Sequence, residues 1–113
     1  MKASEFYVSG WEKVFFGFSV GMDKYSEYEH QHILFSWEHL EVFGIKKSYR
    51  FNYPITNEQA QALKDAEETT FDTIVSWDDL NKAYQDWKYK TSQDMAYQIL
   101  SNVNHKLTTL LNE

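Results

Sequence analysis

The chain contains no cysteine, and this absence removes several classes of function at once. A disulfide framework, a thiolate metal site and a cysteine nucleophile all require a sulfhydryl group. Proline occurs once and glycine four times in 113 residues, which disfavours a low-complexity or fibrous chain. No segment approaches 18 consecutive apolar residues, and the N-terminus has no apolar run of signal-peptide length. We therefore expect a single globular domain over residues 1–113, soluble and cytoplasmic, with no membrane contact.

Basic residues are also scarce. The chain has 11 Lys and Arg against 17 Asp and Glu, for a net charge of −6. The excess lies in the second half, where residues 56–113 hold five lysines against ten acids. A nucleic-acid-binding domain ordinarily carries the opposite sign, concentrated on one face. The charge therefore argues against direct nucleic-acid binding and leaves basic macromolecules as plausible partners.

Apolar side chains alternate along the first half of the chain, which is the period-2 pattern of half-buried strands. EFYV, followed by Ser9-Gly10, indicates a short strand and a turn. Three longer strands are indicated by alternating sets: Val14, Phe16, Phe18 and Val20; Ile33, Phe35 and Trp37; and Tyr49, Phe51 and Tyr53. The last set has Ser48, Arg50 and Asn52 on the opposite face, and Pro54 ends it.

The second half has helical spacing and three helix-start signals. Each is a capping box, a Ser or Thr with an acid or amide three residues on: Thr56 with Gln59, Ser76 with Asp79, and Thr91 with Asp94. We expect the first helix to reach about Glu68. The second should bury Trp77, Leu80, Tyr84 and Trp87, and the third carries the stripe Ala96, Ile99, Val103, Leu107 and Leu110. FDTIV, between the first two helices, is too short to assign as a helix and could be one more strand.

Two pentapeptides nearly repeat: SWEHL at residues 36–40 and SWDDL at residues 76–80. In the second, Val75 and Leu80 flank the Ser76 cap as a hydrophobic staple, so SWDDL marks a helix start. Phe35 and Leu40 flank Ser36 in the same way, and Gly44 is placed as a stop. SWEHLEVFG therefore suggests a strand that runs into a helical turn or two, with one strand continuing through Trp37 as the alternative. We interpret the repeat as shared cap chemistry rather than duplication.

These elements predict an α+β fold, with an N-terminal antiparallel sheet of three to four strands packed by two or three C-terminal helices. Residues 1–55 should be mainly β and residues 56–113 mainly α. YQDWKY could offer an exposed aromatic anchor, although Tyr84 and Trp87 belong to the predicted core stripe and only Tyr89 does not.

Histidines gather in EHQHILFSWEH. If His30 and His32 lay on one strand they would share a face, at a spacing compatible with two ligands of one zinc ion. HxH is a weak signal, however, and no HExxH motif or cysteine pair supports it. Ile33, Phe35 and Trp37 occupy the alternate positions, which should face the core, so His30 and His32 should face solvent. We therefore expect no bound metal and no cofactor.

The most distinctive run is DAEETTFDTIVSWDD, from Asp65 to Asp79, which has six acids and no base. They are Asp65, Glu67, Glu68, Asp72, Asp78 and Asp79. The helix dipole accounts for the two acids in a first turn but not for the two near the end of the first helix. A spaced acidic surface can meet a basic groove and speed association with it. We therefore take these six acids as the candidate partner-binding residues.

Phosphate-loop, dinucleotide and nucleophile-elbow motifs are absent, and we expect no enzyme. In general character (small, acidic, cysteine-free and aromatic-rich) the chain resembles phage-encoded inhibitors such as anti-CRISPR and anti-restriction proteins, and equally the acidic immunity proteins that neutralise nuclease toxins. The resemblance implies an inhibitor that docks on a basic surface of a nucleic-acid-handling protein in a bacterial cytoplasm. The alternatives are a small metal-binding domain or metal-dependent enzyme using His30 and His32, and an assembly subunit that oligomerises through its aromatic residues.

Overall fold

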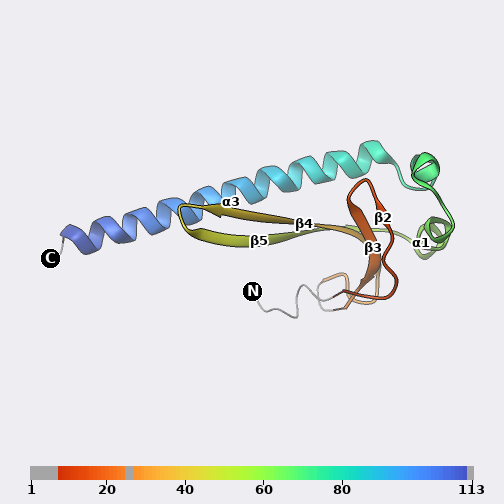
Figure 1. Cartoon of the computed structure of the whole chain (residues 1–113), viewed down its shortest axis with the longest axis horizontal. Coiled ribbons are helices and arrows are strands. Elements are labelled where there is room, and N and C mark those ends of the chain that lie inside the picture. The colour runs from red at the N-terminus through yellow and green to blue at the C-terminus, as the bar shows by residue number, and fades with distance from the viewer. Residues whose placement is uncertain (1–7, 25–26, 112–113) are drawn as a thin grey trace.

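The computed structural model of the chain describes residues 8–24 and 27–111. Its strands come first: β1 (Val8–Ser9), β2 (Val14–Phe15), β3 (Phe18–Asp23), β4 (His32–Val42) and β5 (Ile45–Pro54). The helices follow: α1 (Asn57–Lys64), the 3-10 helix η2 (Glu68–Thr70), α2 (Phe71–Ile74) and α3 (Trp77–Leu111). This order, visible in Figure 1, confirms the predicted α+β fold.

The sheet is antiparallel throughout and four strands wide. Its order is β1-β3-β4-β5, and β2 also pairs with β3. Because β4 occupies one edge of β3, the short strands β1 and β2 pair with successive parts of the other edge. Of the predicted strand at EFYV, only Val8 lies within the described residues, where it opens β1.

The expected strand from Val14 to Val20 is wrong, because these residues form a hairpin. Phe16 and Gly17 have φ values of 52° and 86° and join β2 to β3, with Phe15 paired to Phe18. Positive φ at both turn residues gives the backbone twist that two-residue hairpin turns require. Because of the turn, Phe15 rather than Phe16 faces the core: Phe15 is buried and Phe16 is 51% exposed.

SWEHL contains no helical turn, and the alternative of one continuous strand is the correct one. β4 pairs with β5 over ten residue pairs, from Ile33 opposite Pro54 to Val42 opposite Ile45. Gly44 (φ 79°) follows Phe43 (φ 52°) in the hairpin turn and does not stop a helix. A long ladder of backbone hydrogen bonds therefore outweighs the local cap signal at Ser36. The prediction that Tyr49, Phe51 and Tyr53 share one face holds, since Phe51 lies in the core with Tyr53 packed against it.

The start of α1 follows the prediction and its end does not. Thr56 Oγ1 accepts from Gln59 N at 3.0 Å, and Gln59 Oε1 accepts from Thr56 N at 2.9 Å, which completes the capping box. The helix ends at Lys64 rather than near Glu68. Lys13, fifty residues earlier, donates from Nζ to Leu63 O at 3.3 Å, to Lys64 O at 3.1 Å and to Ala66 O. A cation at a helix C-terminus satisfies free carbonyls and complements the helix dipole.

FDTIV is not a strand, since Phe71–Ile74 form the short helix α2. α3 then begins as predicted after Ser76, whose Oγ accepts from Asp79 N at 3.3 Å. Val75 and Leu80, the staple residues, are 1% and 0% exposed. Asp72 adds a second cap that was not foreseen, because its Oδ1 accepts from Trp77 N at 2.8 Å.

Ser76→Ala should lower the free energy of unfolding by about 1 kcal/mol, since it removes one acceptor from the start of α3 and leaves Asp72 as the remaining cap. Urea titration followed by tryptophan fluorescence measures this change. Ser92→Ala, at an exposed position inside α3, is the matched control and should leave the midpoint nearly unchanged. An unchanged midpoint for Ser76→Ala would mean that Ser76 does not cap the helix.

The predicted boundary at Thr91 does not exist. α3 is one helix of 35 residues, and Thr91 lies inside it, 6% exposed, with its Oγ1 donating to Lys88 O at 2.9 Å. Neither glycine nor proline occurs between Trp77 and Leu111, so nothing in the sequence breaks the helix there. Within the described residues, no helix is both long and apolar enough to cross a membrane.

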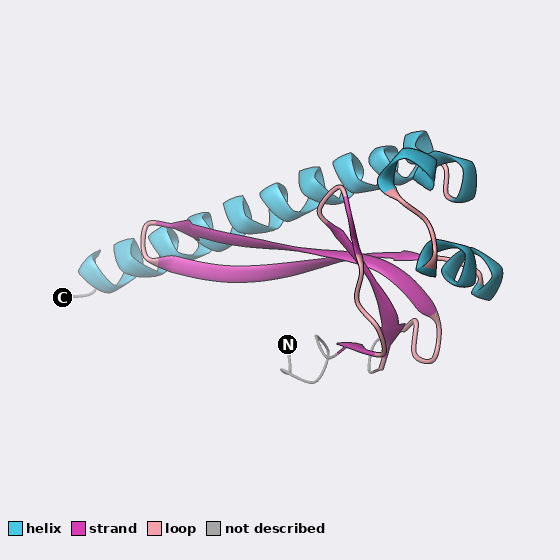
Figure 2. Cartoon of the chain, turned by 45° about the vertical axis from the view of Figure 1, so that its right-hand side comes forward, coloured by secondary structure: helices cyan, strands magenta, loops and turns pink. Residues whose placement is uncertain are grey.

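The core lies at one end of an elongated molecule of 63 × 27 × 18 Å. It contains Phe15, Phe18, Val20, Leu34, Phe51, Ile55, Ala60, Leu63, Ala66, Phe71, Val75 and Leu80. Tyr84 and Trp87 pack against it, as their predicted core stripe requires. Figures 1 and 2 show α3 running lengthwise beside the β4–β5 hairpin and continuing past its tip.

Two polar contacts hold the parts together away from the core. Asp94, in the middle of α3, accepts from Lys47 Nζ at 2.7 Å and from Tyr49 Oη at 2.5 Å, both on β5. These hydrogen bonds lower the pKa of Asp94. Inside the sheet, Arg50 Nη2 donates to both Asp23 carboxylate oxygens at 3.2 Å, with side chains only 3% and 0% exposed.

Candidate functional site

The six acids of the candidate surface lie between the end of α1 and the first turn of α3, at the core end of the molecule (Figure 1). Asp65 caps the end of α1, Glu67 and Glu68 start η2, Asp72 lies in α2, and Asp78 and Asp79 occupy the first turn of α3. All six are exposed. The chain therefore brings the acids to one end of the fold, as expected of neighbours in sequence, and leaves them in water.

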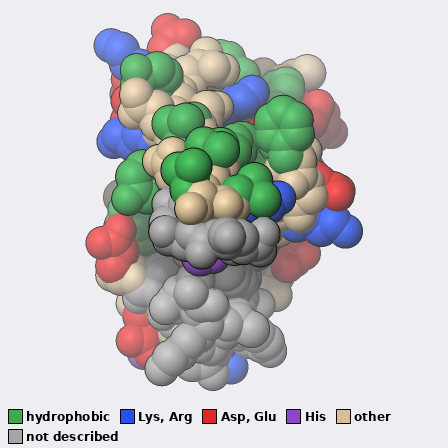
Figure 3. All heavy atoms as spheres, turned by 90° about the vertical axis from the view of Figure 1, so that its left-hand side faces the viewer, with side chains coloured by type: hydrophobic (Ala, Val, Ile, Leu, Met, Phe, Trp, Pro, Cys, Tyr) green, Lys and Arg blue, Asp and Glu red, His purple; other side chains and the backbone are tan. Residues whose placement is uncertain are grey.

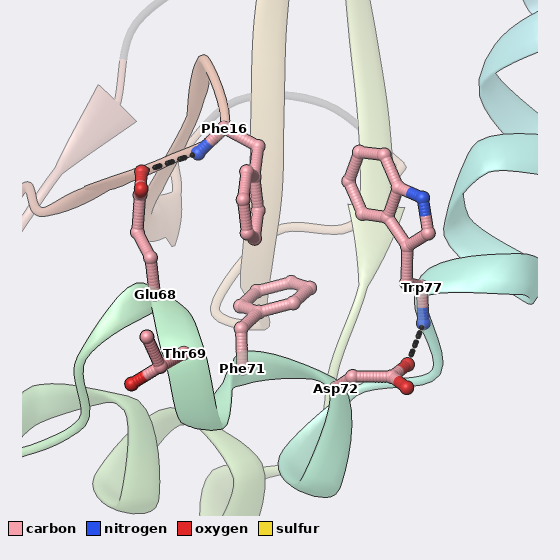
Figure 4. Close-up of a pocket in the computed structure, with 6 residues that line it drawn as sticks. All are labelled: Phe16, Glu68, Thr69, Phe71, Asp72 and Trp77. Carbon is pink, nitrogen blue, oxygen red and sulfur yellow. Dashed lines mark hydrogen bonds between the residues drawn. The ribbon is translucent and has the colours of Figure 1, made fainter.

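A hollow of about 470 Å³ opens among these acids. It is lined by Phe16, Glu68, Thr69, Phe71, Asp72 and Trp77. Figure 4 shows three aromatic rings within this lining and two carboxylates beside them. The ring of Phe16 lies 5.8 Å from that of Phe71 and 5.1 Å from that of Trp77, centroid to centroid. Two of the six acids, Glu68 and Asp72, thus line an aromatic depression.

Phe16 reaches the hollow because it stands at the tip of the β2–β3 hairpin. Its backbone N donates to Glu68 Oε1 at 3.0 Å across 52 residues of sequence (Figure 4). This bond holds the hairpin tip to η2 and leaves a half-exposed ring over the buried ring of Phe71. Sequence reasoning placed Phe16 on the inner face of a strand and so missed it. The available signal was Phe16-Gly17 between the apolar pair Val14-Phe15 and Phe18, which is compatible with a tight hairpin turn.

Two of the six acids have structural tasks within the hollow. Glu68 fixes the hairpin tip, and Asp72 caps the start of α3 through Trp77 N. Each of these carboxylates is therefore oriented by a backbone N–H, at the rim of the aromatic depression. The side chains of Asp65 and Asp78, by contrast, make no hydrogen bond or ion pair with any other described residue, although the backbone N–H of Asp65 donates to Leu63 O. Glu68 and Asp72 are accordingly positioned rim groups, and Asp65 and Asp78 are surface charges.

The charge at this end is not purely negative. Lys13 occupies the end of α1, and the Nζ of Lys64 lies 5.6 Å from the centroid of the Trp11 ring. Both cations sit on the α1 side, whereas the six residues that line the hollow include no lysine or arginine. The negative field is therefore concentrated on the side formed by η2, α2 and the first turn of α3.

An aromatic depression with carboxylates on its rim has a definite chemical preference. The faces of Phe and Trp rings attract cations, and carboxylates accept charge-assisted hydrogen bonds from ammonium and guanidinium groups. A lysine or arginine side chain satisfies both preferences, because its stem is apolar and its head is charged. The hollow is thus suited to a basic side chain of a macromolecule.

The histidine arrangement differs from the one considered for zinc. His30 lies in the turn before β4, with φ of 67°, and not on a strand, so it and His32 do not share a strand face. The Nε2 of His30 lies 3.5 Å from Glu29, His32 Nδ1 lies 3.0 Å from Asn57 Oδ1, and His39 Nδ1 lies 2.7 Å from Ser48 Oγ. Among residues 8–24 and 27–111, no three His, Asp or Glu side chains form a group that could hold a metal ion.

Comparison with protein-family models, with curated proteins and with solved structures gives no match for this chain. The functional assignment therefore depends on the chemistry of the acidic end.

Proposed function

We propose that this chain is a protein-binding domain whose acidic end docks on a basic protein surface. The observation that carries the proposal is the aromatic hollow among the acids, which gives the charged surface a place to hold one basic side chain. An acidic patch alone is often only solubilising. Phe16, which is half-exposed and held in this patch by a long-range hydrogen bond to Glu68, adds a fixed apolar contact surface that a purely charged patch lacks.

The partner that best suits this surface is a protein that handles nucleic acid. Such proteins expose lysines and arginines in grooves that hold phosphates, and a domain of net charge −6 would compete for those grooves. Binding would block the groove, so we propose that the domain acts as an inhibitor, of the kind to which anti-CRISPR and nuclease-immunity proteins belong. Long-range attraction would mainly speed association, and the hollow would mainly slow dissociation.

Charge reversal tests the attraction. Asp65→Lys with Glu67→Lys should slow association with the partner captured from the native host by roughly tenfold at low salt. The difference should shrink as ionic strength approaches physiological values, where the Debye length is ~8 Å. Glu41→Lys with Asp86→Lys, at exposed positions outside the acidic segment, changes the net charge equally and is the matched control. Equal association rates for both variants would make the acidic end a solubilising surface only.

Phe16→Ala tests the hollow on the same captured partner. It leaves every charge in place and removes the exposed ring, so dissociation should accelerate while association stays within about twofold of the parent. Stopped-flow or surface-binding kinetics separates the two rates. If neither variant alters binding, the partner contacts another face.

A further inference from the structure

α3 carries a stripe of exposed side chains, two of which bond to each other, since Gln93 Nε2 donates to Tyr89 Oη at 2.9 Å. The stripe is Tyr89, Gln93, Ala96, Leu100, Val103, Leu107 and Leu110. Its apolar members are large and open to water: Tyr89 is 63% exposed, Leu100 62%, Leu107 52% and Leu110 66%. The predicted C-terminal stripe is therefore real but does not face the core, and its member Ile99 is only half-buried at the edge.

The sheet covers a different side of the same helix. Thr91 and Met95 are 6% and 3% exposed, and they continue the buried line that begins at Leu80 and Trp87. Toward the C-terminus, the sheet-facing side of α3 is polar where it meets the tip of the β4–β5 hairpin. There Gln98, Asn102 and His105 lie with Ile45 around a shallow hollow. The outer stripe thus becomes more apolar over the part of α3 whose sheet-facing side becomes polar.

The spacing of the outer stripe is that of a coiled coil. Successive members are four and three residues apart in strict alternation, from position 89 to position 110. A straight helix repeats every 3.6 residues, so a stripe with a period of 3.5 keeps facing a neighbour only if two helices wind around each other with a left-handed twist. The stripe spans three heptads, about 33 Å at 1.5 Å per residue, which is near the shortest length that sustains such pairing.

The scarcity of charged residues around the stripe indicates which partner it can bind. Residues 96–111 contain one lysine and no acid, although the whole chain has a net charge of −6. A strongly charged partner finds nothing to pair with here. A second copy of the same chain meets an equally apolar surface without repulsion between acids, and two copies supply matching stripes. Figure 3, which faces the end of the molecule where α3 finishes, shows hydrophobic side chains gathered there.

We propose that two copies of this chain pair along the outer stripe of α3 as a parallel coiled coil. The parallel arrangement follows from Gln93, which stands at a core position of the heptad. In a parallel pair it meets the same residue of the second copy, and two amides can hydrogen-bond. In an antiparallel pair centred on the stripe it would meet a leucine, and its amide, whose Nε2 donates to Tyr89 Oη at 2.9 Å, would gain no partner from the second copy. This proposal is independent of the basic partner proposed above.

The mass of the full chain in solution tests the pairing. Light scattering across a concentration series should find two chains per particle for the parent, and one for Leu100→Glu with Leu107→Glu, whose dissociation constant should rise at least 100-fold. Val14→Glu, at a 58% exposed position in β2, is the matched control and should leave the pair intact. Leu100→Gln with Leu107→Gln repeats the test without added charge, and the unfolding midpoint verifies that each variant folds.

Cysteine cross-linking tests the orientation, because the chain has no cysteine of its own. Tyr89→Cys alone and Leu110→Cys alone should each oxidise to a covalent pair when the helices run parallel. Cross-links formed only in a mixture of the two variants would overturn the parallel arrangement. A parent that remains one chain per particle up to roughly 100 µM, which corresponds to a pairing weaker than this value, would overturn the proposal as a whole.

Discussion

Arg50→Met should lower the free energy of unfolding by about 3–5 kcal/mol, a large part of the total stability of a small domain. Arg50 and Asp23 form an ion pair inside the sheet, with the Trp37 ring centroid 5.9 Å from the guanidinium carbon. Methionine keeps most of the volume but removes the guanidinium from a carboxylate that is 0% exposed. The cost arises because the buried carboxylate loses the guanidinium that neutralises its charge and cannot regain water.

The double variant Asp23→Leu with Arg50→Met separates loss of pairing from loss of packing. Removing both charges should cost clearly less than removing Arg50 alone, since the buried carboxylate is removed together with the guanidinium that neutralises it. Lys46→Met is the surface control: its Nζ lies 4.0 Å from Glu41 with both side chains exposed, and the change should stay below about 1 kcal/mol. Chemical denaturation measures all three. If Arg50→Met and the double variant are equally destabilised, the pair contributes by packing alone.

Phe71→Ala should lower the free energy of unfolding by about 3–5 kcal/mol and should also weaken partner binding. Phe71 is 0% exposed, and its ring centroid lies 5.3 Å from that of Phe15 and 6.5 Å from that of Trp77. The same ring belongs to the core and lines the hollow. Truncation therefore leaves a cavity and removes part of the surface that receives the basic side chain.

Phe71→Leu keeps an apolar group in place and should be destabilised by less than the alanine variant, so that binding can be measured on folded protein. Phe43→Ala, at the 82% exposed tip of the β4–β5 hairpin, is the matched control and should change stability by less than about 0.5 kcal/mol. Thermal unfolding ranks the three variants. A fully stable Phe71→Ala variant would show that the hollow is separable from the core.

Only part of the candidate site follows from the sequence. The six acids were identified as a run, and their gathering at one end follows from their closeness in the chain. The hollow could not be identified, because it depends on Phe16, whose amide bonds to Glu68 at a distance of 52 residues. No pattern within a short window encodes which hairpin tip meets which helix.

The sequence by itself determined those features that are decided within about five residues. The capping box at Thr56 and Gln59, the cap at Ser76 and its staple all formed as expected, because a cap is a bond between a side chain and a backbone group three positions away. The shared face of Tyr49, Phe51 and Tyr53 likewise follows from strand geometry alone.

The tertiary structure decided those features for which the local sequence is compatible with two different secondary structures. SWEHL carries the same cap signal as SWDDL, yet Ser36 lies in a strand because β5 offers it a ladder of hydrogen bonds, whereas no strand is paired with Ser76. Thr91 carries a cap signal too, but the helix continues through it because Thr91 and Met95 are buried on the sheet side of α3. A local cap contributes about 1 kcal/mol, and many long-range contacts together outweigh it.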